Sequence, residues 1–127
     1  MDAAVRSHKD LEVWKAAVTL AQSVYRVTDE FGKAEQFGLT LQMRRSAVSI
    51  ASNIAEGAAC KSTKELVQFL YVASGSASEL HTQAEIAKGL FERQTTRLEQ
   101  LQAQVDAVSR MVRALIKSLH ARSQGNQ

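Results

Sequence analysis

The chain has 127 residues, of which 45% are hydrophobic and none is proline, and its formal net charge is +3. This length is enough for one domain with its own core, 1–127, and not for two. The single cysteine, Cys60, excludes a disulfide framework and favours a reducing compartment. The polar N-terminus lacks the apolar stretch of a secretory signal, and the longest charge-free run, 66–78, is too short and polar to span a bilayer. We therefore expect a cytoplasmic protein without membrane contact.

The first helix is predicted over about residues 8–31. Ser7 can cap its start, with Asp10 three residues further on. Phe31 and Gly32 are predicted to end it, because glycine can adopt the left-handed backbone conformation at a helix C-terminus. Residues in steps of three and four, the period of a helix in a bundle, predict its buried face: Leu11, Trp14, Val18, Ala21, Tyr25 and Thr28.

The second helix, predicted over about 39–56 and ended by Gly57, is the most apolar segment. Apolar residues occupy more than half of its circumference, so the other helices are expected to cover it. One narrow row remains polar: Gln42, Arg45, Ser46, Ser49, Ser52, Asn53 and Glu56. The small polar side chains favour contact with protein on this side too. The solvated edge of an ordinary core helix is an equally good explanation.

Two charged residues in this row suggest self-association. Arg45 and Glu56 are about 16 Å apart along a helix axis, too far to pair within one helix. A head-to-tail contact repeated around a closed homo-oligomer could supply a partner to each. We therefore predict an oligomer interface formed by Arg45, Ser49, Ser52, Asn53 and Glu56. Solvation, or bonding to neighbouring helices of the same chain, is the alternative.

The third helix is predicted over about 62–91 and opens with a capping box formed by Ser62 and Glu65. Its apolar seam steps by four and three: Leu66, Leu70, Ala73, Ala77, Leu80, Ala84, Ala87 and Phe91. Gly75 in its middle costs roughly 1 kcal/mol relative to alanine. We expect close approach of a neighbouring helix there as compensation.

The fourth helix is predicted over about 96–121, with Thr96 as its cap and Glu99 three residues further on. Its seam also keeps the heptad spacing: Leu98, Leu101, Val105, Val108, Val112, Leu115 and Leu119. Four helices joined by short loops predict an all-α fold, an antiparallel up-and-down four-helix bundle.

Residue patterns for catalysis or metal binding are missing. No Glu-x-x-His pair exists, and His8, His81 and His120 lie on separate segments without a second ligand one helical turn away. Neither a glycine-rich phosphate loop nor a set of Ser, acid and His can be assembled. Cys60 is interpreted as a structural or neutral residue. We expect no catalytic residue, no metal and no cofactor, and hence no enzyme activity.

The excess of positive charge lies in residues 94–127, which contain five basic residues and two acidic ones. Counted from Leu98 at heptad position a, the outward positions b and f hold Arg113, His120, Arg110 and Lys117. We predict that Arg110, Arg113, Lys117 and Arg122 form a nucleic-acid-binding stripe that contacts phosphates. Readout of bases is not expected, because most aromatic residues fall on predicted core positions. The alternative is an ordinary solvated face, with cations favoured near the helix C-terminus.

Five segments carry a resemblance to a known family: 10–17 (DLEVWKAA), 37–40 (FGLT), 42–50 (QMRRSAVSI), 52–57 (SNIAEG) and 73–76 (ASGS). They resemble the bacterial four helix bundle protein family, which includes proteins encoded in intervening sequences of 23S ribosomal RNA genes. The accessory variability proteins of diversity-generating retroelements are similar at a greater distance. The resemblance covers about residues 8–120. It implies a four-helix protomer in a ring-shaped homopentamer, in an RNA-linked context, and supplies no catalytic residues.

The sequence departs from this family at two positions. Ala51 stands where members usually have proline, and Gly32 where they often have one. Ala51 restores a backbone N–H and implies a straighter second helix.

Two functions are expected from these observations. The first is a non-catalytic oligomeric protein that contacts structured RNA, or an RNA–protein complex, through basic surfaces. In a ring of five the charge would reach about +15, enough to matter for phosphate binding. The alternative is a ring-forming scaffold that docks a partner enzyme without binding nucleic acid. The expected partners are the chain itself, as a pentamer, and RNA or an RNA-processing protein.

Overall fold

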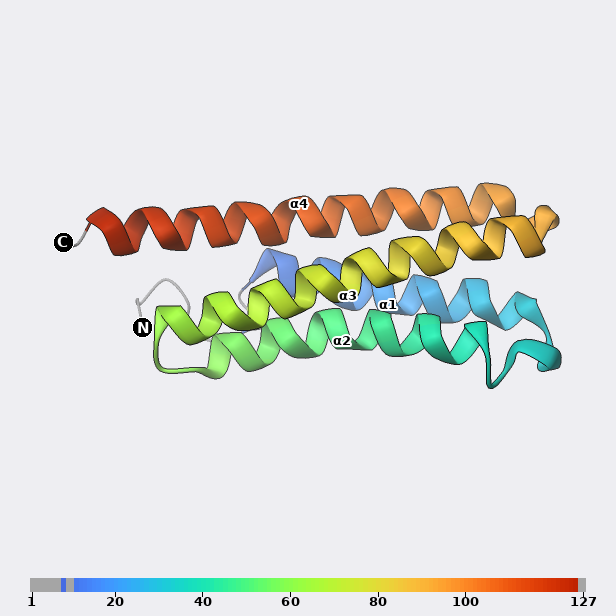
Figure 1. Ribbon diagram of the computed structural model, residues 1–127, viewed down its shortest axis with the longest axis horizontal. Coiled ribbons are helices and arrows are strands. Elements are labelled where there is room, and N and C mark those ends of the chain that lie inside the picture. The colour runs from blue at the N-terminus through green and yellow to red at the C-terminus, as the bar shows by residue number, and fades with distance from the viewer. Residues whose placement is uncertain (1–7, 9–10, 126–127) are drawn as a thin grey trace.

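Four long helices build the computed structural model, which describes His8 and residues 11–125. Their bounds are Glu12–Thr28 (α1), Leu39–Ala59 (α2), Thr63–Leu90 (α3) and Thr95–Gly125 (α4). Short 3₁₀ turns lie at Asp29–Phe31, Lys33–Glu35 and Glu92–Gln94, and no strand occurs among the described residues. The helices run antiparallel in chain order, and α1 and α3 each pack against both α2 and α4 (Figure 1). The predicted up-and-down four-helix bundle is confirmed.

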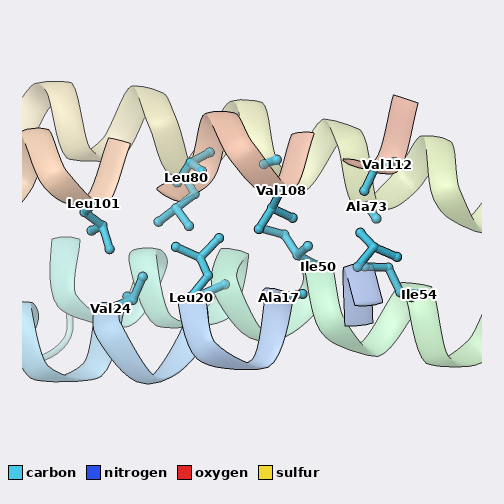
Figure 2. Packing of buried hydrophobic residues seen from close by; sticks show 14 of the residues in the cluster. Ala17, Leu20, Val24, Ile50, Ile54, Ala73, Leu80, Leu101, Val108 and Val112 are labelled. Carbon is cyan, nitrogen blue, oxygen red and sulfur yellow. The ribbon is translucent and has the colours of Figure 1, made fainter. Parts of the chain in front are cut away.

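Aliphatic side chains fill the space between the helices. Figure 2 shows Leu20 and Val24 of α1 on one side of the core, with Leu80 of α3 and Leu101 of α4 on the other. The seam predicted for the third helix is buried from Leu66 to Ala87. Beyond it, the ring of Phe91 stacks on Phe31 with centroids 4.3 Å apart. This pair packs the end of the core where α1 and α3 finish.

The buried face of α1 is rotated by one position from the predicted one. Its buried residues are Val13, Ala17, Leu20, Val24, Val27 and Thr28. Of the predicted face, Thr28 is buried, Trp14 is half-buried and Tyr25 is 43% exposed. The aliphatic series has the same spacing and packs into the core between α2 and α4. Trp14 and Tyr25 instead lie at its margin, where their polar atoms can reach water. The predicted cap residues Ser7 and Asp10 lie outside the described residues.

The C-terminal ends of α1 and α2 also differ from the prediction. The α-helix ends at Thr28, and a 3₁₀ turn continues to Phe31. Gly32 follows with φ +85° and ψ 170°, a positive φ that favours glycine. Helix α2 continues past Gly57 and ends at Ala59. The prediction that Gly57 ends the helix is therefore wrong. Ala51 lies within this uninterrupted helix.

The close approach expected at Gly75 occurs at Gly57 instead. A Cβ atom at position 57 would lie 2.9 Å from both the Cδ1 of Leu66 and the Cβ of Phe69. At Gly75 the same atom would meet no described residue within 4 Å. Gly57 is thus the buried glycine that lets α2 and α3 approach, and Gly75 is an exposed helical residue.

The predicted start of α3 is correct, whereas the predicted start of α4 is wrong by one residue. The Ser62 hydroxyl accepts a hydrogen bond from the Glu65 N–H at 3.1 Å, so the predicted cap of α3 is confirmed. Helix α4 begins at Thr95, and Thr96 therefore lies in its first turn and is not its cap. In its seam, Ile116 is buried while the predicted Leu115 is half-buried. No described helix combines the length and apolarity that crossing a bilayer requires.

Candidate nucleic-acid interface

The four cationic residues of the predicted stripe, Arg110, Arg113, Lys117 and Arg122, are exposed on α4. The heptad positions explain this, because Leu98, Val105, Val112 and Leu119 of the same helix are buried. The last turns of α4, which carry Arg122, extend beyond the start of α3 (Figure 1). The stripe thus begins alongside α3 and ends beyond it.

A groove of about 400 Å³ lies between α3 and α4 at the beginning of this stripe. Hydroxyl, imidazole, carboxylate and guanidinium groups line it beside a few small apolar side chains: Ala77, Ser78, His81, Thr82, Val105, Asp106, Ser109, Arg110 and Arg113. Two of the four predicted cations therefore share a concave site with polar groups of a neighbouring helix. Lys117 and Arg122 do not line this groove.

Several groove side chains can donate hydrogen bonds to a ligand. Arg110 and Arg113 form no ion pair with any described residue. A guanidinium group presents several N–H donors in one plane and matches the oxygens of a phosphate. The Thr82 hydroxyl donates to the Ser78 carbonyl at 3.0 Å, so its proton is already used within α3. The hydroxyls of Ser78 and Ser109 add two neutral donors. This donor set suits a phosphate group.

The opposite end of the groove is acidic. Asp106 Oδ1 lies 3.6 Å from His81 Nε2 across the two helices. Gln102, which is buried, donates to the His81 carbonyl at 3.3 Å and to Glu85 Oε1 at 3.0 Å. Hydrogen bonds from Gln102 and then from Lys88 hold the pKa of the Glu85 carboxyl below its ordinary value. These contacts join α3 to α4. Glu85 is paired with Lys88 at 3.2 Å and lies outside the groove lining, so the negative charge at this end of the groove comes from Asp106. An anion is therefore favoured at the Arg113 end.

The residues predicted for an oligomer interface separate into two groups. Ser49 Oγ lies 2.8 Å from Ser76 Oγ of α3, and Asn53 Nδ2 donates to the carbonyl and hydroxyl of Ser49 at 2.8 and 3.0 Å. Both residues therefore have partners within the chain. Arg45, Ser52 and Glu56 are exposed. Within the described part of the chain, the side chains of Arg45 and Glu56 form no ion pair.

A structural role of Arg44 is absent from the sequence prediction. Its Nε donates to the Thr28 hydroxyl at 2.9 Å, and its Nη2 donates to Asp29 Oδ1 at 2.8 Å. Its guanidinium carbon lies 4.4 Å from the centre of the Tyr25 ring. The side chain thereby ties α2 to the end of α1. Sequence offers no signal that separates Arg44 from Arg45, because the difference depends on where α1 ends.

The expectation that Trp14, Tyr25 and most phenylalanine rings lie at core or near-core positions is wrong for Tyr25, and two other aromatic residues are also exposed. Tyr25, Phe37 and Tyr71 are 43%, 83% and 56% exposed. Tyr71 directly follows the seam residue Leu70 and is not itself part of the seam. The heptad spacing therefore indicated that Tyr71 lies outside the core.

Metal and thiol chemistry receive no support from the described residues. His8 and residues 11–125 contain no group of three His, Cys, Asp or Glu placed to hold a metal ion. Desolvation, followed by a hydrogen bond and the charges of Glu65 and Glu56, raises the pKa of the Cys60 thiol. A raised pKa disfavours the reactive thiolate.

Comparison with known proteins gives a matching family and a similar solved structure. The model of the family described as 23S rRNA-intervening sequence protein matches residues 9–114. A 1.70 Å crystal structure of a protein with unknown function, from the S23 ribosomal protein family of Bacteroides thetaiotaomicron VPI-5482, is similar with a TM-score of 0.74. The two chains are 19% identical over 83% of this chain and 98% of that chain, so the likeness concerns the fold. No curated protein matches.

Proposed function

The chain belongs to the 23S rRNA-intervening sequence protein family, and from this premise we propose that it is a non-catalytic, oligomeric protein that associates with nucleic acid. It contacts structured RNA, or an RNA–protein complex, through the basic surface of α4. The observation that carries this proposal is the exposure of Arg110, Arg113 and Lys117 on a helix with no acid after Asp106. The protein acts in the cytoplasm as a ring-shaped homopentamer.

Long cationic side chains on one helix face suit a phosphate backbone better than base edges. Arg110 and Lys117 are seven residues apart, which is about 10.5 Å along the helix axis. Such a row neutralises successive phosphates and releases counterions, which makes affinity depend strongly on salt. Repetition of the row around a symmetric ring multiplies this effect.

Replacing the three cations tests the proposal. The variant Arg110→Gln, Arg113→Gln, Lys117→Gln should keep its helicity, because all three side chains are exposed. Its RNA affinity should fall for all sequences alike, and the slope of log affinity against log salt should flatten by about one for each lost phosphate contact. Fluorescence anisotropy with a labelled RNA hairpin measures both quantities.

A matched control separates this surface from net charge. Arg26→Gln, Lys33→Gln, Arg93→Gln removes the same charge from exposed positions outside the stripe. This control should retain most of the affinity. Equal losses in the two variants would contradict a stripe on α4, and no binding by the wild type at low salt would refute RNA association.

A ring-forming scaffold that docks a partner enzyme is the second candidate. The exposed apolar side chains of Val48 on α2, and of Tyr71 and Val72 on α3, favour it. Exposed apolar residues of this kind are common in protein–protein contacts. Copurification of the native protein distinguishes the two functions: a specific protein without RNA supports the scaffold.

A further inference from the structure

Tyr71 is an exposed aromatic residue on the same face of α3 as the groove. It precedes the groove residue Ser78 by seven positions, or two helical turns. Residues at this spacing lie on one side of a helix, about 10.5 Å apart along its axis. Lys64 precedes Tyr71 by another seven positions and is also exposed. One side of α3 therefore carries a hydroxyl, an aromatic ring and an ammonium group in a row.

Helix α4 continues its cations in the same direction. His81 lies beside Asp106 and Lys88 beside Glu99, so residue numbers rise along α4 as they fall along α3. Lys117 follows the groove residue Arg110 by two turns, just as Tyr71 precedes Ser78 by two turns. Tyr71 on α3 and Lys117 on α4 thus lie in the same direction from the groove, each two helical turns beyond it.

We propose that this α3–α4 face binds an unpaired segment of RNA, with a phosphate in the groove and a base stacked on Tyr71. Arg110, Arg113 and the two serine hydroxyls hold the phosphate, and Lys117 and Lys64 meet the backbone further along. This inference rests on the proposed RNA association and specifies the kind of RNA. A basic groove that follows the backbone, combined with an exposed aromatic ring, is the usual design for single strands.

The surroundings favour this ring over the other exposed aromatic residues. The Arg44 guanidinium already covers the Tyr25 ring at 4.4 Å. Phe37 lies in the α1–α2 connection, outside the groove lining and the cation row. The acid Asp106 lies at the end of the groove away from Tyr71, so an anionic strand is favoured at the end toward Tyr71. Paired bases have no free face for stacking, which is why the segment must be unpaired.

Two variants of Tyr71 test the stacking contact. Tyr71→Leu keeps an apolar side chain and removes the aromatic ring, whereas Tyr71→Phe keeps the ring. Anisotropy is measured with an unstructured RNA oligonucleotide and with a fully paired, blunt-ended RNA duplex. Tyr71→Leu should weaken binding of the unstructured RNA about tenfold and leave binding of the duplex unchanged. Tyr71→Phe should bind both like the wild type, and Phe37→Leu is the control for loss of an exposed ring elsewhere.

The outcomes separate this inference from the proposed function. If the triple cation variant loses RNA but Tyr71→Leu binds the unstructured RNA normally, stacking is refuted and RNA association stands. Equal weakening for both RNAs also refutes selection of unpaired strands. A wild type that binds no RNA at low salt refutes both proposals. Light scattering of Tyr71→Leu completes the test, because a changed oligomer size would assign Tyr71 to a protein interface and overturn the inference.

Discussion

Gly57 of α2 lies so close to α3 that a Cβ atom on it would be 2.9 Å from the Cβ of Phe69. The same atom would be 3.2 Å from the Leu66 carbonyl oxygen, which belongs to the backbone of α3. Neither neighbour is the free end of a flexible side chain, so a larger residue must separate the helices. Glycine at this position sets the distance between α2 and α3.

Substituting Gly57 and Gly75 should therefore have opposite effects. Gly57→Ala should lower the free energy of unfolding by about 1–3 kcal/mol through overpacking. Gly75→Ala should raise it by up to about 1 kcal/mol, because alanine favours the helix and its methyl group meets no described neighbour. Urea unfolding followed by circular dichroism measures both. A stabilised Gly57→Ala variant would contradict the packing, and a destabilised Gly75→Ala variant would indicate a contact at that surface.

Arg44 should contribute to stability while its neighbour Arg45 does not. Arg44 donates to the hydroxyl of Thr28, which is buried, and Arg44→Gln should cost about 1–2 kcal/mol of unfolding free energy. The ion pair with Asp29 adds little, since that carboxylate is largely exposed. Arg45→Gln changes the adjacent exposed arginine and, for the dissociated protomer, should stay within about 0.5 kcal/mol of the wild type. Equal losses of unfolding free energy in both variants would contradict a stabilising role of the Arg44 hydrogen bonds.

Arg45 should matter for self-association instead. We expect the wild type to form a closed oligomer in solution and Arg45→Ala to form a smaller one, since the mutant loses a charged contact between protomers. Light scattering at matched protein concentrations measures the mass of each. A monomeric wild type rules out the oligomer, and an unchanged mass in the mutant removes Arg45 from the interface.

Glu85 should make folding stability depend on pH in the acid range. Hydrogen bonds from Gln102 and Lys88 hold its folded-state pKa below the ordinary value of 4.5. The unfolded state therefore binds its proton first, so the contribution is complete above pH 4.5 and is lost as the pH falls through the folded-state pKa. Glu85→Gln should make stability less dependent on pH below 4.5. Thermal unfolding across the acid range tests this, with the exposed Glu79→Gln as the control. Parallel profiles for wild type and Glu85→Gln would contradict the expectation.

Local patterns were sufficient for the number, order and approximate length of the helices. Heptad spacing depends on the period of a single helix, and the Ser62 cap depends on residues three positions apart, so both can be read without knowing the neighbours. The outward places of Arg110, Arg113 and Lys117 followed from the same period.

The tertiary structure alone decided which of two equally spaced series on α1 is buried, because that choice depends on the space left between α2 and α4. It also decided that Gly57, and not Gly75, allows close approach, since this requires the position of Phe69 on the neighbouring helix. The groove has the same origin. Ser78 and His81 lie about thirty residues from Arg110 and Arg113 in the chain and meet them because α3 and α4 pack side by side, a long-range contact that no local spacing encodes.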